Sequence, residues 1–252
     1  MNCRICGGID LTKFLDLGHH PPSDAFLTEE DLNLAEVTYP LTVWMCNDCS
    51  LAQLGYTVSK NTLFNENYPY TTGSNKDGIR HFRQMAKDLV ERHGKGFVVD
   101  IGGNDGTLLR GFRGLGCTVL NIEPCANIAA ESPVPTINHF WDSGIAKAVK
   151  EDFGKAHIIT ATNVLAHVDD LHGFMRAVNV LLDDDGVFVV ECPDFVSLLA
   201  TSTYDTIYHE HLSYFDVFSM TELIKMHHME IVKLTKVDIH GGSNRYEIQR
   251  VQ

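Results

Sequence analysis

The chain has 252 residues, of which 44% are hydrophobic and 21% are charged, so one large domain or two smaller ones with a real core are expected. Its net charge of −13 argues against nucleic acid or an anionic membrane surface as the main partner. No apolar run approaches the length of a membrane span, and the first residues lack the apolar region of a signal peptide. We therefore expect a cytoplasmic protein whose seven cysteines are thiols or metal ligands.

The first expected element is a metal-binding lobe built on two C-x-x-C pairs. The pairs are formed by Cys3 and Cys6 and by Cys46 and Cys49. Each pair can place two thiolates on one turn, and two such turns complete a tetrahedral zinc site. A strand-like run, residues 39–45, precedes the second pair, which predicts a hairpin beside the metal. Two redox or unrelated cysteine pairs are the alternative, which the matched spacing disfavours. Four protein ligands leave no open position, so the zinc of this lobe, residues 1–70, should be structural.

A loop and a helix are expected to follow the lobe. Residues 64–74 are rich in Asn, Pro, Thr and Gly, and they carry Tyr68 and Tyr70. The apolar spacing beyond them predicts a helix that begins after Ser74 as its N-cap and ends at Gly94. Packing is the commoner role for such tyrosines, but a cleft at a domain junction is also where ligands bind.

The next stretch has the pattern of a nucleotide-binding α/β unit. Residues 97–101 predict a buried strand, and Gly102-Gly103-Asn104-Asp105-Gly106 follows it directly before a helix. The dinucleotide pattern G-x-G-x-x-G is absent, because Asn104 occupies its second glycine position. A second strand, residues 117–123, ends in Glu123, whose carboxylate can accept both ribose hydroxyls of an adenosine.

The alternation of strands and helices continues to the end of the chain. Strands are predicted at residues 136–140, 157–162, 186–192, 230–239 and 245–251, and helices begin near Ser143 and near Asp169 or Asp170. Five β-α units that end in a β-β pair are the layout of an α/β, Rossmann-like class I methyltransferase with a mostly parallel seven-stranded sheet. We expect this domain to occupy residues 71–252.

Ligands of such sheets bind beyond the carboxyl ends of the strands. Five features follow strands and are expected to project toward one crevice: Asn104, Glu123, Asn163, His167 and the stretch Tyr208-His209-Glu210-His211-Leu212-Ser213-Tyr214-Phe215. A loop whose polar groups satisfy one another is the simpler interpretation of that stretch alone. Its place after the fifth strand favours a proton-transfer site. Alternation would put Glu210 and His211 on opposite sides of a strand, so the chain must bend there if they act together.

In these motifs the sequence resembles the deoxysugar C-methyltransferases of nucleotide-sugar pathways. The resemblance rests on the paired cysteines, Asn67-Tyr68-Pro69-Tyr70, the glycine turn, Ile122-Glu123-Pro124, Asn163-Val164-Leu165-Ala166-His167-Val168, residues 205–215 and His240-Gly241-Gly242-Ser243. It implies transfer of a methyl group from S-adenosylmethionine to a sugar carbon next to a ketone. The implied substrate is a nucleotide-linked 4-keto-6-deoxysugar, in the first place a dTDP-sugar.

The resemblance also implies roles for single residues. His211 would be the base, with Glu210 orienting or tuning it, and His209 would be structural. Ketone and hydroxyl oxygens would be held by Tyr208, His167 and one of Tyr68 or Tyr70. The implied cofactor-binding residues are Asp100, Gly102, Asn104, Asp105, Gly106, Glu123 and Asn163.

Two points stay open at the level of sequence. Members of the family usually continue into a further C-terminal α/β domain that helps to form the sugar-nucleotide site, and this chain ends just after its last predicted strand. A fragment and a shortened relative are both compatible with that. The rival functions are an NAD-dependent oxidoreductase, disfavoured by the missing dinucleotide pattern and the closing β-β pair, and an inactive zinc- and cofactor-binding interaction module.

Overall fold

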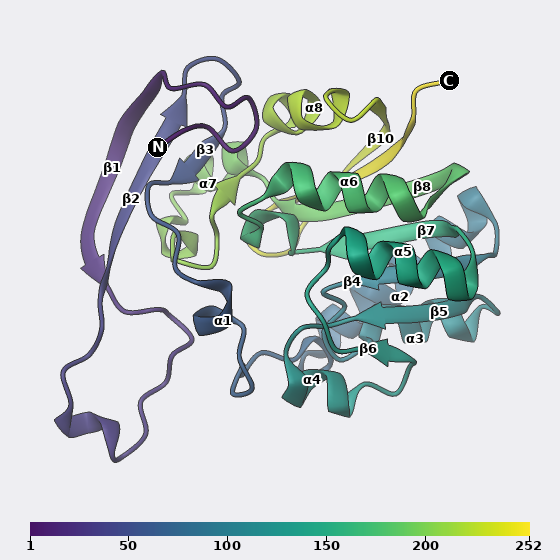
Figure 1. Cartoon of the computed structure of the whole chain (residues 1–252), viewed down its shortest axis with the longest axis horizontal. Coiled ribbons are helices and arrows are strands. Elements are labelled where there is room, and N and C mark those ends of the chain that lie inside the picture. The colour runs from purple at the N-terminus through teal and green to yellow at the C-terminus, as the bar shows by residue number, and fades with distance from the viewer.

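The computed structural model describes residues 1–252 and is built around two sheets (Figure 1). The larger sheet has seven strands in the order β10-β11-β8-β7-β4-β5-β6. Its strands are β4 (Phe97–Ile101), β5 (Thr118–Ile122), β6 (Thr136–Ile137), β7 (Ala156–Thr162), β8 (Leu182–Pro193), β10 (Met229–Val237) and β11 (Ser243–Arg250). Strands β4 to β8 pair in parallel, whereas β11 pairs antiparallel with both β8 and β10. The structure therefore confirms the predicted mostly parallel sheet with a closing β-β pair.

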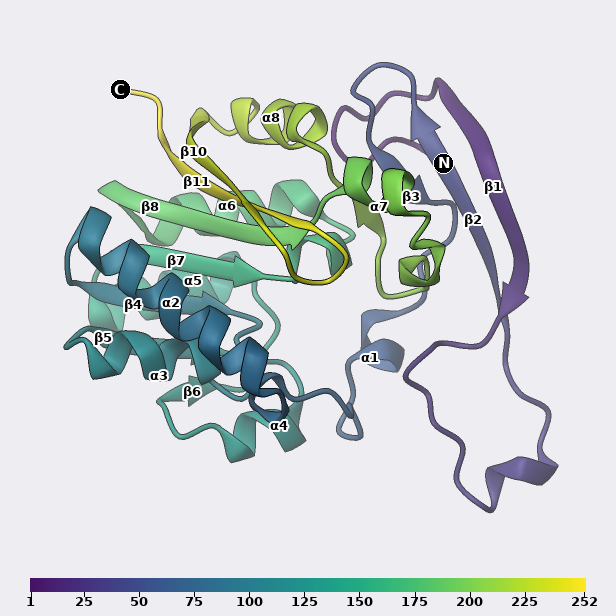
Figure 2. The same cartoon turned by 180° about the vertical axis from the view of Figure 1, so that it is seen from behind.

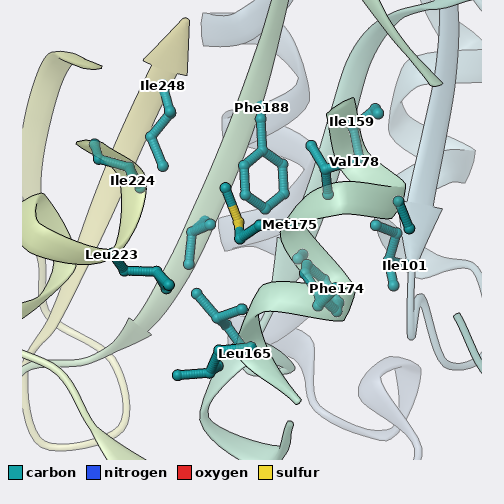
Figure 3. Close-up of a cluster of buried hydrophobic side chains, with 14 of the residues drawn as sticks. Ile101, Ile159, Leu165, Phe174, Met175, Val178, Phe188, Leu223, Ile224 and Ile248 are labelled. Carbon is teal, nitrogen blue, oxygen red and sulfur yellow. The ribbon is translucent and has the colours of Figure 1, made fainter. Parts of the chain in front are cut away.

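Helices cover both faces of this sheet. One face carries α5 (Ser143–Phe153), α6 (Leu171–Leu181) and α8 (Val217–Lys225), and the other carries α2 (Lys76–His93) and α3 (Thr107–Gly114) (Figures 1 and 2). Figure 3 shows how Phe174 and Met175 of α6 pack beside Phe188 of β8 in the larger of two apolar clusters that enclose the sheet. Short helices α4 (Ala126–Glu131) and α7 (Phe195–Thr201) follow β5 and β8. No helix combines the length and the apolar composition that a membrane crossing needs.

The smaller sheet belongs mostly to the N-terminal lobe. It contains β1 (Leu11–His20), β2 (Tyr39–Cys46) and β3 (Ala52–Leu54), which pair antiparallel and confirm the predicted hairpin beside the second cysteine pair. Its fourth strand, β9 (Ser213–Tyr214), comes from the end of the Tyr208 stretch and pairs with β3. The short helix α1 (Lys60–Leu63) then leads out of the lobe. The lobe and the stretch with the candidate base thus share one sheet.

Several element bounds differ from the prediction, among them two helix starts and the end of β6. Asn75, not Ser74, caps α2, because its side-chain oxygen accepts the backbone N–H of Asp77. Asp142, not Ser143, caps α5 in the same way with two backbone N–H groups. Strand β6 ends at Ile137, before the predicted end of the strand, where the next side chain, an asparagine, donates to two backbone carbonyls outside the ladder.

Candidate active site and zinc centre

The four predicted zinc ligands come together. The sulfur atoms of Cys3, Cys6, Cys46 and Cys49 lie within 4.8 Å of one another. Two of these pairs are separated by 3.4 and 3.5 Å, close to the separation of about 3.8 Å that follows from tetrahedral geometry with Zn–S bonds of about 2.3 Å. The contact between Cys3 and Cys49 lowers the pKa of Cys3 to about 5 and raises the pKa of Cys49, so the two thiols share one proton that is less readily lost from Cys49. The donor set and its packing therefore fit a structural zinc ion.

A cavity of about 1320 Å³ lies where the carboxyl ends of the parallel strands meet the N-terminal lobe. Its volume exceeds the range of about 300–1,000 Å³ that suits one small ligand. The sequence-predicted residues that line it are Tyr68, Tyr70, Asp100, Gly102, Asn104, Glu123, Asn163, His167, Tyr208 and His211. Three predicted residues, Asp105, Gly106 and Glu210, lie outside the lining. The predicted single crevice is therefore present.

The glycine turn after β4 allows the backbone to approach a ligand. Gly102 has a φ of 60°, and a Cβ atom there would lie 2.6 Å from a side-chain carbon of Val164. A Cβ atom on Gly103 would meet the side chains of Asp100 and Asn121. Both positions consequently require glycine, and both glycines line the cavity.

Glu123 stands at the end of β5, beside this turn. Its two carboxylate oxygens accept the backbone N–H groups of Asn104, at 3.0 Å, and Cys125, at 2.8 Å. Each oxygen keeps a further lone pair for a ligand hydroxyl. Burial raises the pKa of Glu123, and the two N–H groups counteract part of that rise. This arrangement can hold the two hydroxyls of a ribose.

Asn104 and Asp105, the next two residues of the glycine turn, form hydrogen bonds with the loop that joins the N-terminal lobe to α2. Asn104 accepts the backbone N–H of Thr72 at 2.8 Å and donates to the carbonyl of Tyr70 at 3.0 Å. Asp105 accepts the N–H of Gly73 at 2.7 Å through one oxygen, and its other oxygen accepts an N–H at the start of α3. These side chains fix the shape of the turn, and the backbone of Asn104 is held as well, by Glu123 at its N–H and by the side-chain amide of Asn121 at its carbonyl.

The glycine turn and Glu123 form one half of the cavity, the cofactor half. Two buried acceptor oxygens in this half lack a hydrogen-bond partner. They are Oδ2 of Asp100 and Oδ1 of Asn163. The other oxygen of Asp100 accepts the hydroxyl of Thr160 at 2.6 Å, and burial raises the pKa of Asp100 to about 7. Because unpaired buried acceptors are costly, a donor such as an ammonium group is expected to complete them.

The Tyr208 stretch bends, as predicted, and places His211 in the other half of the cavity. Nδ1 of His211 lies 2.7 Å from the carbonyl oxygen of Thr206, which can only accept, so Nδ1 carries the proton. Nε2 is then an acceptor and lies 3.1 Å from the hydroxyl of Tyr208. Burial lowers the pKa of His211 to about 4. The imidazole is therefore neutral, and its lone pair is on the nitrogen beside Tyr208.

His167 stacks between two rings. Its ring centroid lies 5.1 Å from that of His211 and 5.4 Å from that of Phe64. Burial and the neighbouring His211 hold the pKa of His167 well below its usual value. Its Nε2 is buried without a partner. The two histidines thus form a neutral, stacked pair with one nitrogen of His167 available to a ligand.

Glu210 does not orient His211, because it points to a different partner. One of its oxygens lies 3.4 Å from the hydroxyl of Tyr68, and the partner of His211 is the carbonyl of Thr206. His209 is buried against the smaller sheet, where its Nε2 lies 3.3 Å from the carbonyl of Tyr39. Reasoning from sequence missed Thr206, because a backbone acceptor leaves no signal in residue identity.

The amino-acid sequence matches two known protein families and a curated relative. Residues 3–64 match a family model described as "Putative zinc binding domain", and residues 79–234 match one described as "Methyltransferase domain". The chain is 33% identical over 247 residues, 96% of its length, to the C-methyltransferase NovU of Streptomyces niveus. It spans 59% of the length of that relative.

Solved structures, methyltransferases among them, share the fold. Magnesium protoporphyrin IX methyltransferase from Synechocystis PCC 6803, with bound SAH, has a TM-score of 0.53 at 14% identity, over 69% of this chain and 83% of that one. The PH0226 protein from Pyrococcus horikoshii OT3 has a TM-score of 0.57 at 13% identity, over 72% and 95%. By its fold and its two family matches, the chain belongs to the methyltransferase-domain family, with a zinc-binding domain ahead of a class I methyltransferase domain.

Proposed function

We propose that this chain catalyses transfer of a methyl group from S-adenosylmethionine to a carbon next to the ketone of a nucleotide-linked 4-keto-6-deoxysugar, in the first place a dTDP-sugar. The observation that carries the proposal is the neutral, buried His211, whose Nε2 lies in the same cavity as the glycine turn and Glu123. The candidate base and the cofactor half lie in the same cavity, which suits a reaction between two molecules bound side by side. The cavity volume leaves room for both.

The cofactor half fits S-adenosylmethionine. Glu123 has two free lone pairs for ribose hydroxyls, and the unpaired oxygens of Asp100 and Asn163 suit an ammonium group. Gly102 lets the backbone approach the ligand. S-adenosylmethionine supplies an electrophilic methyl group on a sulfonium centre. Asp105 and Gly106 would serve this site by shaping the turn.

The catalytic half provides a base and donors. Nε2 of His211 takes the proton from the carbon beside the ketone, the C–H electron pair forms the enolate double bond, and negative charge develops on the ketone oxygen. That charge stabilises the imidazolium that forms next to it. Burial raises the pKa of both Tyr68 and Tyr208 far above neutrality, so both phenols keep their protons. We assign them, with His167, to hold the developing oxygen and the neighbouring hydroxyls.

The comparison with the C-methyltransferase of Streptomyces niveus supports carbon as the acceptor atom, since it extends across both the lobe and the methyltransferase domain. The test uses His211→Asn, which keeps a polar side chain and removes the base. We expect S-adenosylmethionine to bind this variant, as measured by calorimetry, while methyl transfer to a panel of dTDP-4-keto-6-deoxysugars is lost.

The matched control is His19→Asn, which alters an exposed histidine of β1 and should leave both measurements unchanged. Normal turnover by His211→Asn would refute the assigned base. Binding of NAD in place of S-adenosylmethionine would refute the cofactor and favour the oxidoreductase alternative.

A further inference from the structure

Three nearly parallel rings form a stack in the catalytic half of the cavity. The ring of His167 lies between those of Phe64 and His211, with interplanar angles of 17° and 25° and centroid separations of 5.4 and 5.1 Å. All three side chains line the cavity. The two histidines already have places in the proposed chemistry. Phe64 has no polar atom, so any part that it plays must act through the rings that it touches.

Phe64 belongs to the segment that leads out of the N-terminal lobe. It directly follows α1, which lies between the lobe and the larger sheet in Figures 1 and 2. Its backbone N–H donates to the carbonyl of Lys60 at 2.8 Å, which closes the last turn of α1. The side chain of Asn65 donates to the carbonyl of Thr62 at 2.9 Å and accepts the N–H of Asn67 at 2.8 Å. The backbone on both sides of Phe64 is therefore fixed, which gives its ring a firm attachment.

Packing alone sets the ring plane of His167. His211 differs from it, because hydrogen bonds with Thr206 and Tyr208 hold both of its ring nitrogens. Neither ring nitrogen of His167 forms a hydrogen bond within the chain, and its Nε2 is buried. The torsion between an sp³ carbon and a ring is broad, so the rotamer preference of the side chain does not fix the plane either. The faces of the two neighbouring rings are what remains to fix it.

The stack carries no charge that would push its rings apart. Burial holds the pKa values of His167 and His211 well below the usual value for histidine, so both imidazoles are neutral at neutral pH. Aromatic rings in contact favour offset or tilted arrangements over a direct face-to-face one, and the centroid separations of this stack lie in the range of such pairs.

We propose that Phe64 is a positioning residue of the active site, whose ring holds the imidazole of His167 in the plane in which its Nε2 meets the substrate. Nε2 lies off the axis about which the ring turns, so a change of plane carries it away from the ligand. Phe64 also contacts Tyr68, at 5.5 Å between ring centroids, and so supports a second side chain that we assign to the substrate oxygens. The effect on methyl transfer rests on the proposed function, whereas the orientation of the ring does not.

The orientation can be measured without substrate, by nuclear magnetic resonance of protein labelled with ¹³C at histidine. His167→Asn and His211→Asn identify the resonances of the two rings. We expect Phe64→Leu to shift the resonances of both, because His167 loses the ring stacked on it and turns, and His211 then has a different neighbour on its face. Phe64→Met, a second variant without a ring, should do the same. Phe64→Tyr keeps the ring and should restore both sets of resonances toward those of wild-type protein.

The matched control is Phe153→Leu. Phe153 is the last residue of α5, lies outside the cavity lining, and stacks on Phe97 at 5.5 Å and 19°, much as Phe64 stacks on His167. Its loss should leave the resonances of both cavity histidines unchanged. A shift in Phe64→Leu that is confined to His167, with His211 unmoved, would show that Phe64 only packs and would overturn its positioning role.

A second readout is methyl transfer. Phe64→Leu should lower kcat by about 10- to 100-fold through misplacement of His167, with little change in KM for S-adenosylmethionine, and Phe64→Tyr should recover most of the rate. In a His167→Asn background, Phe64→Leu should cause no further loss, because both changes remove the same interaction.

Two outcomes of this assay count against the proposals, and they are distinguishable. Losses that multiply in the double variant would overturn the action of Phe64 through His167. Lack of any turnover by wild-type protein would refute the proposed function, while the histidine resonances would still decide whether Phe64 sets the ring plane of His167.

Discussion

Arg4 offers the sharpest test of how the lobe is joined to the catalytic half. It stands between two zinc-ligand cysteines, yet its guanidinium group reaches across the domain junction. It donates to the backbone carbonyls of Leu54 at 3.0 Å and Leu212 at 3.2 Å, and to the hydroxyl of Thr57 at 2.8 Å. It also pairs with Asp169 at 2.9 Å. One side chain thereby ties the zinc knuckle to β3 and to the residue that follows the candidate base.

We expect Arg4→Met to lower the free energy of unfolding by about 2–3 kcal/mol, since methionine keeps an apolar stem but removes the donors. The Asp169 carboxylate is 63% exposed, so the ion pair contributes little. Most of the loss should come from the two buried carbonyls, at about 1 kcal/mol each, with the Thr57 bond as a smaller addition. Urea denaturation measures this change.

Arg80→Met is the matched control. The side chains of Arg80 and its partner Asp77 are both 79% exposed, so their loss should change stability by no more than about 0.5 kcal/mol. If Arg4→Met were as mild as this control, the carbonyl contacts would carry no energy and the argument would fail. Because Leu212 follows His211, Arg4→Met should also lower the rate of methyl transfer while binding of S-adenosylmethionine is retained.

Three further outcomes are expected. Cys46→Ser should lower the zinc content, measured by mass spectrometry of the metal, and destabilise the lobe. Arg245→Met should cost about 2–3 kcal/mol in denaturation experiments, because it removes the guanidinium 2.7 Å from the fully buried carboxylate of Glu191 and leaves that carboxylate only the imidazole of His81 at 2.6 Å. The folded-state pKa of His211 is lowered from 6.5 to about 4, so the unfolded chain binds this proton first, and stability should fall by about 3 kcal/mol from pH 6.5 to pH 4. His211→Asn should flatten that part of the pH profile.

The spacing of residues along the sequence predicted those parts of the site whose position depends only on residues nearby in the chain. The cysteine pairs, the glycine turn and the acid at the end of β5 each lie within a few residues of the element that positions them, so the chain around them suffices to predict their placement. The convergence of Asn163 and His167 with the glycine turn followed from one rule of parallel sheets, that strand ends meet at one edge. The bend at Glu210 and His211 was predicted on the premise that the two side chains act together; the bend is present, but the two side chains have different partners.

The missed features depend on contacts between distant residues. Strand β9 joins the sheet of the lobe, more than 150 residues away in sequence, and two residues cannot show such pairing by composition. Asp24 lies in the connection between β1 and β2, which has no periodicity, and only the folded chain brings it to the cavity. The helix caps were wrong by one residue because asparagine, aspartate and serine all cap helices and stood next to each other.

These contacts give the zinc lobe a part in the proposed chemistry beyond its own stability. The bend that carries His211 continues directly into β9, and β9 is held by β3, which lies next to the strand that ends in Cys46. Loss of zinc would loosen this sheet edge first, and the candidate base would lose its anchor while the glycine turn and Glu123, on the far side of the cavity, would keep theirs. A metal-free protein should therefore lose methyl transfer at lower chelator concentrations than binding of S-adenosylmethionine. Equal loss of both would show that the zinc supports the whole fold and not the catalytic half in particular.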